Sequence, residues 1–484
     1  MKKFTILGSG TAGLIAATMI KRTWNAKCQV SVIYNSKKKN IGVGESTTPI
    51  IHYFIEKYLF GIKDLLKNTN TTIKTGINFK NWIPNTEYFH GFPELDWHED
   101  GEYRCAIYSL VNGCYNGGIL HNEPSTTIPT VYYQKLNALH IDTQELSNYV
   151  YNAIKDEVNF VDDIVDEVFS DGKNITGLQC RNSGLHEADY YIDCSGFDSL
   201  LLKKLSPEWN DISNILPLDR AIPQQIPFDF SKDGIPSYTL AEATKNGWIW
   251  RIPIGNRYGT GYNYSSKFTS DEEARKDYDG WLKKSFNVEL NTDRIINYNP
   301  GYYSDYWIGN CVAIGLSSGF VEPLESTGIH IIVQQIKTFI EHNSSLKGLD
   351  YNRKQCNHLN KCLYQEIVEF ITLHYFVNRK DSKFWEYMYD NRTEWIESFS
   401  KKCKEEFLLG KNIEESKVFW EVDSYIQVAN GLQMFDNESI KEFLEWQPDK
   451  DTIIERAKSY AEELEKSKKI VTRLSHSEYL NNFR

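Results

Sequence analysis

A glycine-rich hexapeptide near the start of the chain has the residue types needed to bind a dinucleotide. The run Gly8-Ser9-Gly10-Thr11-Ala12-Gly13 follows the apolar stretch Phe4–Leu7 and precedes Leu14–Trp24, which has helical spacing. The first glycine permits a tight turn, the second lets backbone N–H groups approach a pyrophosphate, and the third allows close packing of helix on strand. The start of the helix also favours anionic phosphates. The pattern therefore predicts a dinucleotide site, with FAD and NAD equally open, formed by Gly8, Gly10, Thr11, Ala12 and Gly13.

The next predicted strand departs from the usual dinucleotide pattern. Gln29–Ile33 leads into Tyr34-Asn35, where an acidic residue commonly accepts the ribose hydroxyls. Adenosine would then be held by Asn35 or Ser36, or held more weakly.

A second unusual pattern is Trp248-Ile249-Trp250-Arg251-Ile252-Pro253. Alternate residues of a strand point to the same face, so both indoles should lie on one side. Pro253 should prevent the strand from continuing as a central one, because proline lacks a backbone N–H. Taken alone, a W-x-W pair is more often core packing than a functional feature.

The elements around these patterns predict an α/β (α+β) protein. Residues 151–200 indicate further strands of the nucleotide-binding module, and Cys311–Gly315 indicates another, followed by a helix from His330 to about Glu341. The last 140 residues have helical spacing and few Gly or Pro. We predict a Rossmann-like module over residues 1–335, discontinuous and with substrate-side insertions near 75–130. A mainly helical substrate-binding module follows over residues 336–484.

Bulk composition narrows the possible partners. A length of 484 residues favours two modules. The net charge of −11 argues against nucleic acid or an anionic membrane as the main partner. Spanning a bilayer would need about 18 consecutive apolar residues, which the sequence lacks. Nine cysteines without a C-x-x-C pair favour reduced thiols and a cytoplasmic location, and we expect no metal site.

The order of three glycine-punctuated strand ends, near residues 8, 195 and 313, resembles flavoproteins of the hydroxybenzoate-hydroxylase type. Within that group the chain resembles flavin-dependent halogenases of the tryptophan-halogenase family. The resemblance rests on Gly42-Val43-Gly44-Glu45-Ser46-Thr47, the W-x-W-x-I-P run and Glu322-Pro323-Leu324-Glu325-Ser326-Thr327-Gly328. Weaker matches extend over most of the chain and include Leu139-His140-Ile141-Asp142 and His374-Tyr375. The resemblance implies FAD, supplied as FADH2 by a separate flavin reductase, and a halide ion as co-substrate.

The same resemblance implies that Lys74 is the catalytic lysine, because Ile73-Lys74-Thr75-Gly76-Ile77-Asn78-Phe79-Lys80-Asn81-Trp82 matches the family's lysine pattern. Lys80 lies outside the matched slot, and from composition alone a lysine is usually a surface residue. An ammonium can polarise hypohalous acid through a hydrogen bond, whereas a neutral amine can be halogenated to a haloamine. Both modes remain open.

Glu325 occupies the family's glutamate slot, which implies a carboxylate that stabilises a cationic arene intermediate and takes up its proton. A carboxylate at the start of a helix is also favourable for purely structural reasons. The halide is expected at Thr327 and Gly328, since backbone N–H groups at a helix start bind anions.

Further flavin and substrate contacts are implied by the resemblance. The flavin contacts are Val43, Glu45, Val168, Leu316 and Ile329. The substrate-side residues are His90, Phe92, Trp248 and Trp250, and the two tryptophans should keep the organic substrate away from the flavin.

The resemblance does not identify the substrate. The family's adjacent tyrosine pair for free tryptophan has no counterpart in residues 424–450, so an indole or phenol of another kind is at least as plausible. The alternatives are an aromatic hydroxylase, a flavoprotein that binds FAD without turnover, and a relative that acts on a carrier- or protein-bound substrate. Oligomeric state is open, including a homo-oligomer.

Overall fold

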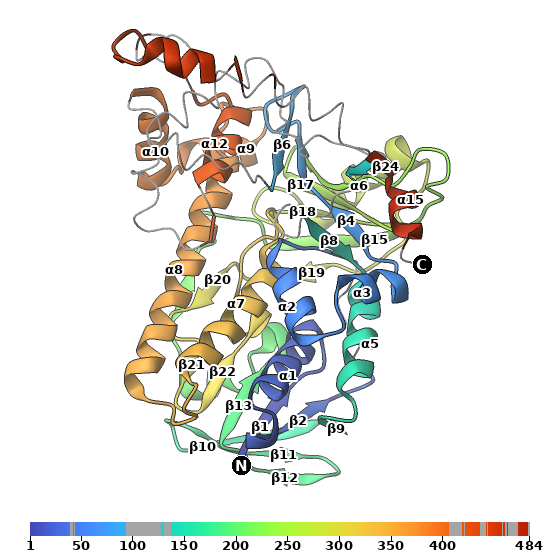
Figure 1. Cartoon of the computed structure of the whole chain (residues 1–484), viewed down its shortest axis with the longest axis vertical. Helices are drawn as coiled ribbons and strands as arrows, with labels where there is room; N and C mark the ends of the chain where they lie inside the picture. Colours follow the sequence, from blue (N-terminus) through green and yellow to red (C-terminus); the bar gives the residue numbers. More distant parts are fainter. Residues whose placement is uncertain are drawn as a thin grey trace.

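The computed structural model describes residues 1–38, 42, 44–92, 127–129, 137–405, 419–420 and 422–435, and then 442, 444–456, 458–459, 462 and 473–482. In Figure 1 a six-stranded sheet lies at the end of the molecule that holds the N-terminus, and a seven-stranded sheet lies toward the opposite end. The long helix α8 (Asp350–His374) runs beside both. Sheets with covering helices confirm the predicted α/β (α+β) class.

The six-stranded sheet is the nucleotide-binding sheet predicted from the glycine-rich turn. Its strands, in order, are β21 (Trp307–Ile308), β22 (Cys311–Ala313), β13 (Tyr190–Asp193), β1 (Lys2–Leu7), β2 (Cys28–Tyr34) and β9 (Asn159–Asp162). All neighbours are parallel except β21 and β22. Strands buried on both faces need apolar, often β-branched residues, and Val30, Val32 and Ile33 of β2 satisfy this requirement.

Helices cover this sheet and complete its core. They are α1 (Thr11–Trp24), α2 (Ile50–Tyr58), α3 (Ile62–Asn68), α5 (Thr143–Ile154) and α7 (Thr327–His342). Helix α1 packs against α2, α5 and α7. Helix α7 begins at Thr327, three residues before the predicted start, because Ser326 already provides the turn into the helix.

The seven-stranded sheet carries the W-x-W-x-I-P run. Its order is β19 (Ile296–Asn297), β15 (Arg220–Pro227), β18 (Arg257–Tyr264), β17 (Gly247–Ile254), β16 (Tyr238–Ala243), β5 (Gly76–Lys80) and β6 (Glu87–Gly91). Strand β17 pairs with β16 only as far as Arg251 and then continues beside β18 alone. Pro253 therefore lies beyond the central part of the strand, as its missing N–H requires.

A small three-stranded sheet lies between the two large ones and holds the predicted catalytic lysine (Figure 1). Its order is β3 (Glu45–Ser46), β8 (Ala138–Ile141) and β4 (Thr72–Lys74). Ser46 pairs with His140 on one side of β8, and Thr72 pairs with His140 on the other. Side chains from three distant parts of the sequence thus form one row.

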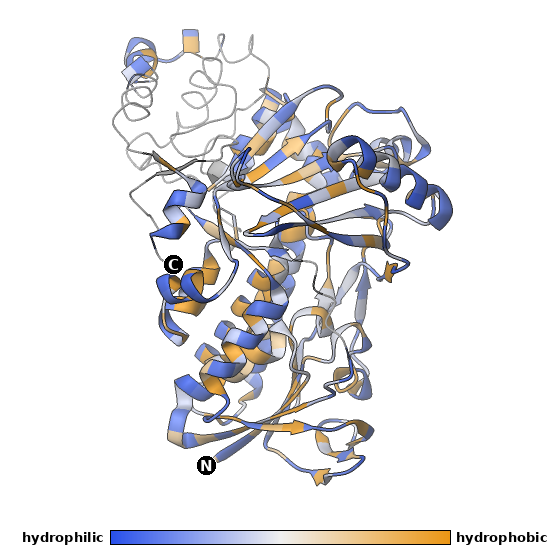
Figure 2. Ribbon diagram, turned by 90° about the vertical axis from the view of Figure 1, so that its right-hand side faces the viewer, coloured by the Kyte–Doolittle hydropathy of each residue, from blue (hydrophilic) through white to orange (hydrophobic). Residues whose placement is uncertain are grey.

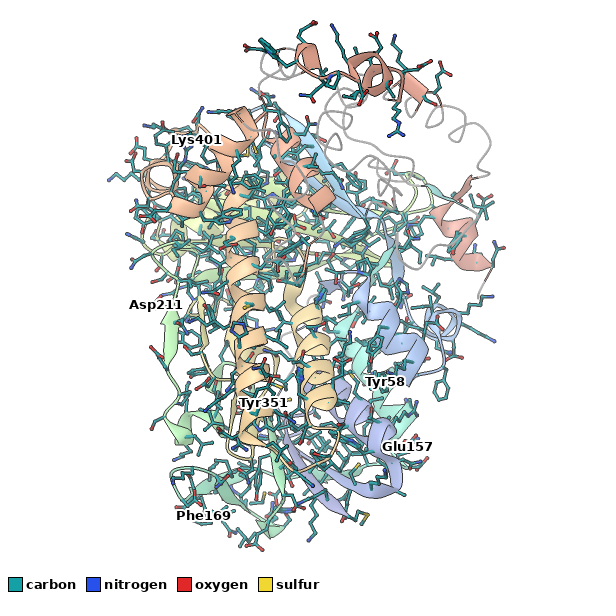
Figure 3. The ribbon with its side chains drawn as sticks, turned by 60° about the vertical axis from the view of Figure 1, so that its left-hand side comes forward. Tyr58, Glu157, Phe169, Asp211, Tyr351 and Lys401 are labelled. Carbon is teal, nitrogen blue, oxygen red and sulfur yellow. The ribbon has the colours of Figure 1, made fainter. Side chains whose placement is uncertain are left out.

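The remaining strands form smaller sheets. They are β10 (Val165–Ser170), β11 (Ile175–Cys180) and β12 (Gly184–His186); β14 (Trp209–Asp211), β20 (Gly301–Tyr303) and β23 (Gly319–Phe320); and β7 (Thr127–Pro129) with β24 (Arg473–Ser475). The 3-10 helices are η1 (Asn25–Lys27), η5 (Gly196–Asp198), η6 (Leu202–Leu205) and η7 (Gly315–Ser317). Figure 3 shows Phe169 of β10 and Lys401 of the C-terminal part near opposite ends of the molecule.

The C-terminal part is mainly helical where it is described. Its helices are α8, α9 (Lys383–Asp390), α10 (Glu394–Glu405), α12 (Val422–Gly431) and α15 (His476–Asn481), and α6 (Asp271–Phe286) precedes them. One hydrophobic cluster joins Phe79 and Trp82 of the β5 region to Ile371 of α8 and Tyr425 of α12. Figure 2 shows hydrophobic residues on the strands and on helix faces turned toward them. The two-module division stays a prediction, and its boundary at 335/336 falls inside the continuous helix α7.

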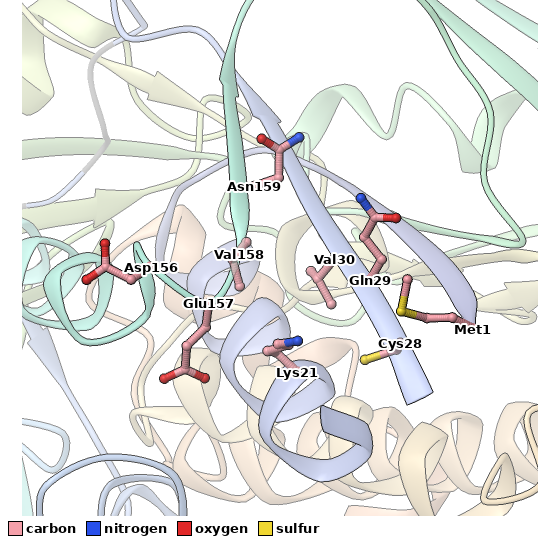
Figure 4. Close-up of a pocket in the computed structure, with 9 residues that line it drawn as sticks. All are labelled: Met1, Lys21, Cys28, Gln29, Val30, Asp156, Glu157, Val158 and Asn159. Carbon is pink, nitrogen blue, oxygen red and sulfur yellow. The ribbon is translucent and has the colours of Figure 1, made fainter. Parts of the chain in front are cut away.

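An open hollow of about 410 Å³ lies at the amino ends of the parallel strands, lined among others by Lys21, Cys28, Glu157 and Asn159 (Figure 4). Open α/β sheets bind their ligands at the carboxyl ends of the strands. The hollow therefore lies at the opposite end of the strands from the predicted dinucleotide site.

Candidate active site

The glycine-rich turn has the geometry of a phosphate cradle. Gly8 follows β1 with φ +114°, and a Cβ there would lie 2.3 Å from the Cys194 carbonyl oxygen. A Cβ on Gly13 would lie 1.9 Å from the Gly8 carbonyl oxygen. Gly10 is the N-cap of α1 and has no side chain to occupy the first N–H groups, and the first turn contains no acidic residue. The turn at Thr11 and Ala12 thus offers free N–H groups to an anion, so these residues fit a dinucleotide.

We expect Gly13→Ala to lower FAD affinity at least about tenfold and to destabilise the fold by about 1–3 kcal/mol, because the new methyl group overlaps backbone. Fluorescence titration with FAD and urea unfolding would measure the two effects. Gly280→Ala is the matched control: its Cβ meets open space within helix α6, so it should be neutral or stabilising. Equal effects of both variants would contradict the cradle.

An acidic group does stand near the end of β2, but a neighbouring strand supplies it. Ser36 donates its backbone N–H to Asp162 Oδ1 at 2.9 Å, and Asp162 is the last residue of β9, beside β2. Asn35 Oδ1 accepts the Lys37 N–H at 3.0 Å. Sequence spacing within β2 had no means of revealing Asp162, since the pairing of β2 with β9 is a tertiary feature.

Lys74 is fully buried at the end of β4. Its Nζ donates to the Thr47 carbonyl oxygen at 2.8 Å and to Ser326 Oγ at 2.9 Å, and it lies 5.2 Å from the centre of the Phe92 ring. Burial lowers the pKa of the ammonium to about 7, and the negative charge of Glu325 acts in the opposite direction. A buried lysine that exists as both amine and ammonium near neutral pH is typical of a functional site.

Glu325 is buried between two histidines. Its two carboxylate oxygens each lie 3.0 Å from His90 Nδ1, and Oε1 lies 2.7 Å from His374 Nε2. Burial alone would raise the carboxyl pKa, but His90 and His374 outweigh it and lower the pKa to about 2. Tyr88 OH lies 2.7 Å from His374 Nδ1 and orients that ring. Glu325 is therefore a fixed negative charge at any physiological pH.

Lys74 is hydrogen-bonded to the N-cap residue of α7, and the start of this helix has a geometry that favours an anion. Ser326, the N-cap, has φ 63°, and its backbone N–H donates to the Pro323 carbonyl oxygen at 3.0 Å. Thr327 is buried and its Oγ1 has no hydrogen-bond partner among the described residues. Gly328 is exposed, and its Cβ position lies 4.0 Å from Glu45 Oε2. An unpartnered buried hydroxyl beside a helix N-terminus fits a bound halide.

The two tryptophans of β17 form a fixed pair. Their ring centres are 6.1 Å apart in a T-shaped arrangement, which confirms that both lie on one face. Trp248 is buried and donates its indole N–H to Glu322 Oε2 at 3.0 Å, and Tyr375 donates to the same oxygen at 3.1 Å. A Cβ on Gly261, the partner of Trp250 in β18, would lie 2.2 Å from that indole. The pair is thus tied to the Glu322–Gly328 segment as well as to the sheet.

The remaining predicted flavin residues differ in where they lie. Leu316 is half-buried in η7, next to Gly315, whose Cβ position is 3.4 Å from Ala12. Ile329 is fully buried in the core with Ile332, not on the open side of α7 where Gly328 lies. Val168 lies in the separate β10–β12 sheet and packs against a different cluster. Val43 lies outside the described residues.

Sequence reasoning missed several partners in the site. Glu325 contacts His374, whose ring is oriented by Tyr88. Trp248 donates to Glu322, which also accepts from Tyr375. The His374-Tyr375 pair is a weak match to the family, but no spacing pattern links it to residues about 50 positions away. Trp446, an aromatic residue of the segment 424–450, is 80% exposed and does not belong to a buried site. Of the predicted insertions near 75–130, residues 75–92 and 127–129 are described.

Comparison with known proteins places this site in a family. Residues 3–445 match the model of the tryptophan halogenase family. Tryptophan 6-halogenase SttH of Streptomyces toxytricini is 30% identical over 420 residues, covering 79% of this chain and 80% of SttH. Tryptophan 7-halogenase RebH of Lentzea aerocolonigenes is 29% identical over 416 residues, covering 79% and 78%. The structure of Tar14, a tryptophan C-6 flavin-dependent halogenase (chlorinase) from taromycin biosynthesis, matches with TM-score 0.86 at 26% identity, covering 100% of both chains.

Fold and site thus define a flavin-dependent enzyme of the oxidoreductase class. The chain belongs to the tryptophan halogenase family, whose members halogenate aromatic substrates. Over the described part of the chain, no helix is long and apolar enough to cross a membrane, and no cluster of three or more His, Cys, Asp or Glu could hold a metal ion.

Proposed function

We propose that this enzyme uses FADH2, O2 and halide to make hypohalous acid near the start of α7, and that Lys74 directs electrophilic halogenation of an indole- or phenol-type substrate. The observation that carries the proposal is the bond from the buried Lys74 Nζ to Ser326 Oγ, 2.9 Å long, one residue before the anion-binding turn. This bond connects the start of α7, where halide oxidation is expected, to Lys74, where transfer of the halogen to the substrate is expected.

The cofactor would be held by the glycine-rich turn, Gly8 to Gly13, with Leu316 and the Glu45 region on the flavin side. When bound, reduced FAD supplies the two electrons with which O2 and halide give hypohalous acid and water. A separate flavin reductase would deliver FADH2, since the chain has one dinucleotide turn of this kind in its sequence. Thr327 and Gly328 would hold the halide through backbone N–H groups and the free Thr327 hydroxyl.

The surroundings of Lys74 allow it to interact with hypohalous acid either as an ammonium or as a neutral amine. The Thr47 carbonyl and Ser326 hydroxyl accept two of its N–H groups, and these two bonds can persist in a neutral amine. The third position on nitrogen then carries an N–H in the ammonium and a lone pair in the amine. The geometry therefore supports both hydrogen-bond activation of hypohalous acid and formation of a haloamine.

Glu325 would act on the arene after halogen transfer. Because His90 and His374 keep its carboxylate ionised, it stabilises a cationic intermediate and can accept the proton that leaves. His90 also presents a buried Nε2 without a partner among described residues, and Phe92 lies beside Lys74. These groups give the substrate side an aromatic wall and one unused polar atom.

Trp248 and Trp250 would separate the flavin from the organic substrate. Trp248 cannot swing away without breaking its bond to Glu322 within a buried cluster. A substrate kept from the flavin is not hydroxylated there, so the oxidant is left for halide.

Halide binding should weaken above about pH 7. Burial raises the Glu45 carboxyl pKa to about 7, so Glu45 is neutral below that pH and negatively charged above it, close to Gly328. We expect the halide dissociation constant to rise by about tenfold per pH unit above 7 in the limit of exclusive binding. Changes in the absorption spectrum of bound FAD on adding bromide would measure it. Glu45→Gln should make the affinity clearly less dependent on pH between 6 and 9, leaving the contribution of the nearby Lys74 ammonium, and an unchanged slope would contradict this role.

The function is tested by an assay with FAD, a flavin reductase, NADH and O2, offering indoles and phenols with chloride, bromide or iodide separately. We expect a halogen mass shift by mass spectrometry that disappears in Lys74→Ala. A shift of one oxygen would instead identify an aromatic hydroxylase.

A further inference from the structure

A continuous chain of hydrogen bonds leads away from Lys74 to a second buried titratable group. Lys74 Nζ donates to Ser326 Oγ at 2.9 Å, and Ser326 Oγ donates to Ser46 Oγ at 2.9 Å. Ser46 Oγ lies 2.7 Å from Thr239 Oγ1, which lies 2.9 Å from His140 Nε2. Every member is buried or half-buried. Its members come from β4, the N-cap of α7, β3, β16 and β8.

The two ends determine the direction of every bond in the chain. Thr72 Oγ1 donates to the Pro253 carbonyl at 2.7 Å, so at its 3.2 Å contact with His140 Nδ1 it accepts. His140 Nδ1 therefore carries the proton, and Nε2 is the acceptor of the Thr239 hydroxyl. Thr239 must then accept from Ser46, and Ser46 from Ser326. All hydroxyls point from the donor-only Lys74 end toward the basic nitrogen of His140.

We propose that Ser326, Ser46 and Thr239 form a proton relay, and that His140 acts as a positioning residue that takes a proton from Lys74 and returns it. In the forward step an Nζ–H bond of Lys74 breaks, each hydroxyl passes its proton to the next oxygen, and an Nε2–H bond forms on His140. The products are a neutral amine and an imidazolium, so charge and protons balance. The return step restores the ammonium.

This relay suits the position of both groups. Lys74 and His140 are fully buried, so direct exchange with solvent water is hindered, yet the proposed function requires control of the charge on Lys74. Burial is the main factor that disfavours the charged form of His140, and the charges of Lys74 and His476 act in the same direction. Once Lys74 has lost its proton, one of these two opposing charges is gone. The pair therefore holds one proton between them rather than two.

His476 has a different task. Its Nε2 accepts the Ile73 N–H at 2.9 Å and its Nδ1 lies 3.1 Å from the Ile235 carbonyl oxygen, so both nitrogens bond to backbone. It ties α15 to β4, next to Lys74, and is not a link of the relay.

The test is an NMR titration of the full chain with 13C-labelled lysine and histidine, with and without oxidised FAD. Lys74→Ala identifies the Lys74 resonance, and His140→Gln identifies that of His140. In the wild type we expect the His140 resonances to shift at the Lys74 midpoint, because the hydrogen-bond chain carries the change at Lys74 to His140. In Thr239→Val, which keeps the side-chain shape but removes the hydroxyl, the His140 step should vanish and the Lys74 midpoint should fall by about half a pH unit, because Ser326 becomes a weaker acceptor. Ser46→Ala cuts the chain on another strand and should give the same result.

Two controls separate the relay from general damage. Thr239→Ser keeps the hydroxyl and should retain the coupled titration. Thr260→Val removes a buried hydroxyl from the same sheet, where it donates to the Trp250 carbonyl oxygen and interacts with Tyr278, and should leave the titration unchanged. In single-turnover halogenation, Thr239→Val should be slowed about tenfold with an altered pH profile, and Thr239→Ser should recover the rate. Wild-type titrations in both Thr239→Val and Ser46→Ala would overturn the relay.

The inference rests on the proposed function for its purpose, but the titration does not require turnover. Coupled titration without any halogenated product would support the relay and refute the proposed function. Lysine-dependent halogenation with independent titrations of Lys74 and His140 would do the reverse.

Discussion

Lys74→Ala is expected to lower the rate of product halogenation by about 10²–10⁴-fold while FADH2 oxidation continues. The substitution removes the amine that is proposed to bond hypohalous acid at the end of β4, but it leaves the glycine-rich turn and the start of α7 intact. Halogenated product by mass spectrometry and flavin reoxidation by absorbance, measured in the same reaction, would check both parts of the expectation.

Lys80→Ala is the matched control for this experiment. Lys80 lies six residues further on in β5, with its side chain 39% exposed and its Nζ 3.9 Å from Glu242. A partly exposed pair at this distance contributes little, about 0–1 kcal/mol, so halogenation should be unchanged. If Lys74→Ala still made product at the wild-type rate, the assignment of Lys74 would be wrong.

Glu325→Gln is expected to reduce halogenation by about 10²–10³-fold, because it removes one fixed charge from a buried site where a cation develops. The amide has nearly the same shape as the carboxylate and can still contact His90 and His374. The Lys74 pKa should also fall further below 7, since Glu325 is the group that raises it. Single-turnover rates over a pH series would measure both effects.

Glu322→Gln provides the comparison. Glu322 lies three residues away, is equally buried, and contacts Trp248 and Tyr375 instead of the histidines. Burial raises its pKa to about 7, so near neutral pH much of it is already uncharged and its replacement should have a much smaller effect. Equal losses in the two variants would mean that the segment needs its shape rather than the charge of Glu325.

The most local predictions agreed best with the structure. The strand, turn and helix at residues 4–24 formed where expected, because apolar residues on a β-strand and glycines at fixed offsets act within a few residues of one another. The one-sided Trp248 and Trp250 pair and the limit set by Pro253 are equally local, since the two-residue repeat of a strand decides both. Helix α7 began three residues early because Ser326 adopts a left-handed conformation that residue type alone does not reveal.

The sequence by itself determined the family, the nucleotide turn and the candidates Lys74 and Glu325, because each lies in a short motif that can be read without knowing the fold. Tertiary structure alone decided their surroundings. Lys74 is buried by segments that are distant in the sequence, and this burial lowers its pKa. The two histidines that keep Glu325 ionised also come from distant segments. The row of Ser46, His140 and Thr72 exists only because β3 and β4 pair on opposite sides of β8. Contacts across strands depend on register and packing, which no spacing within a single segment encodes.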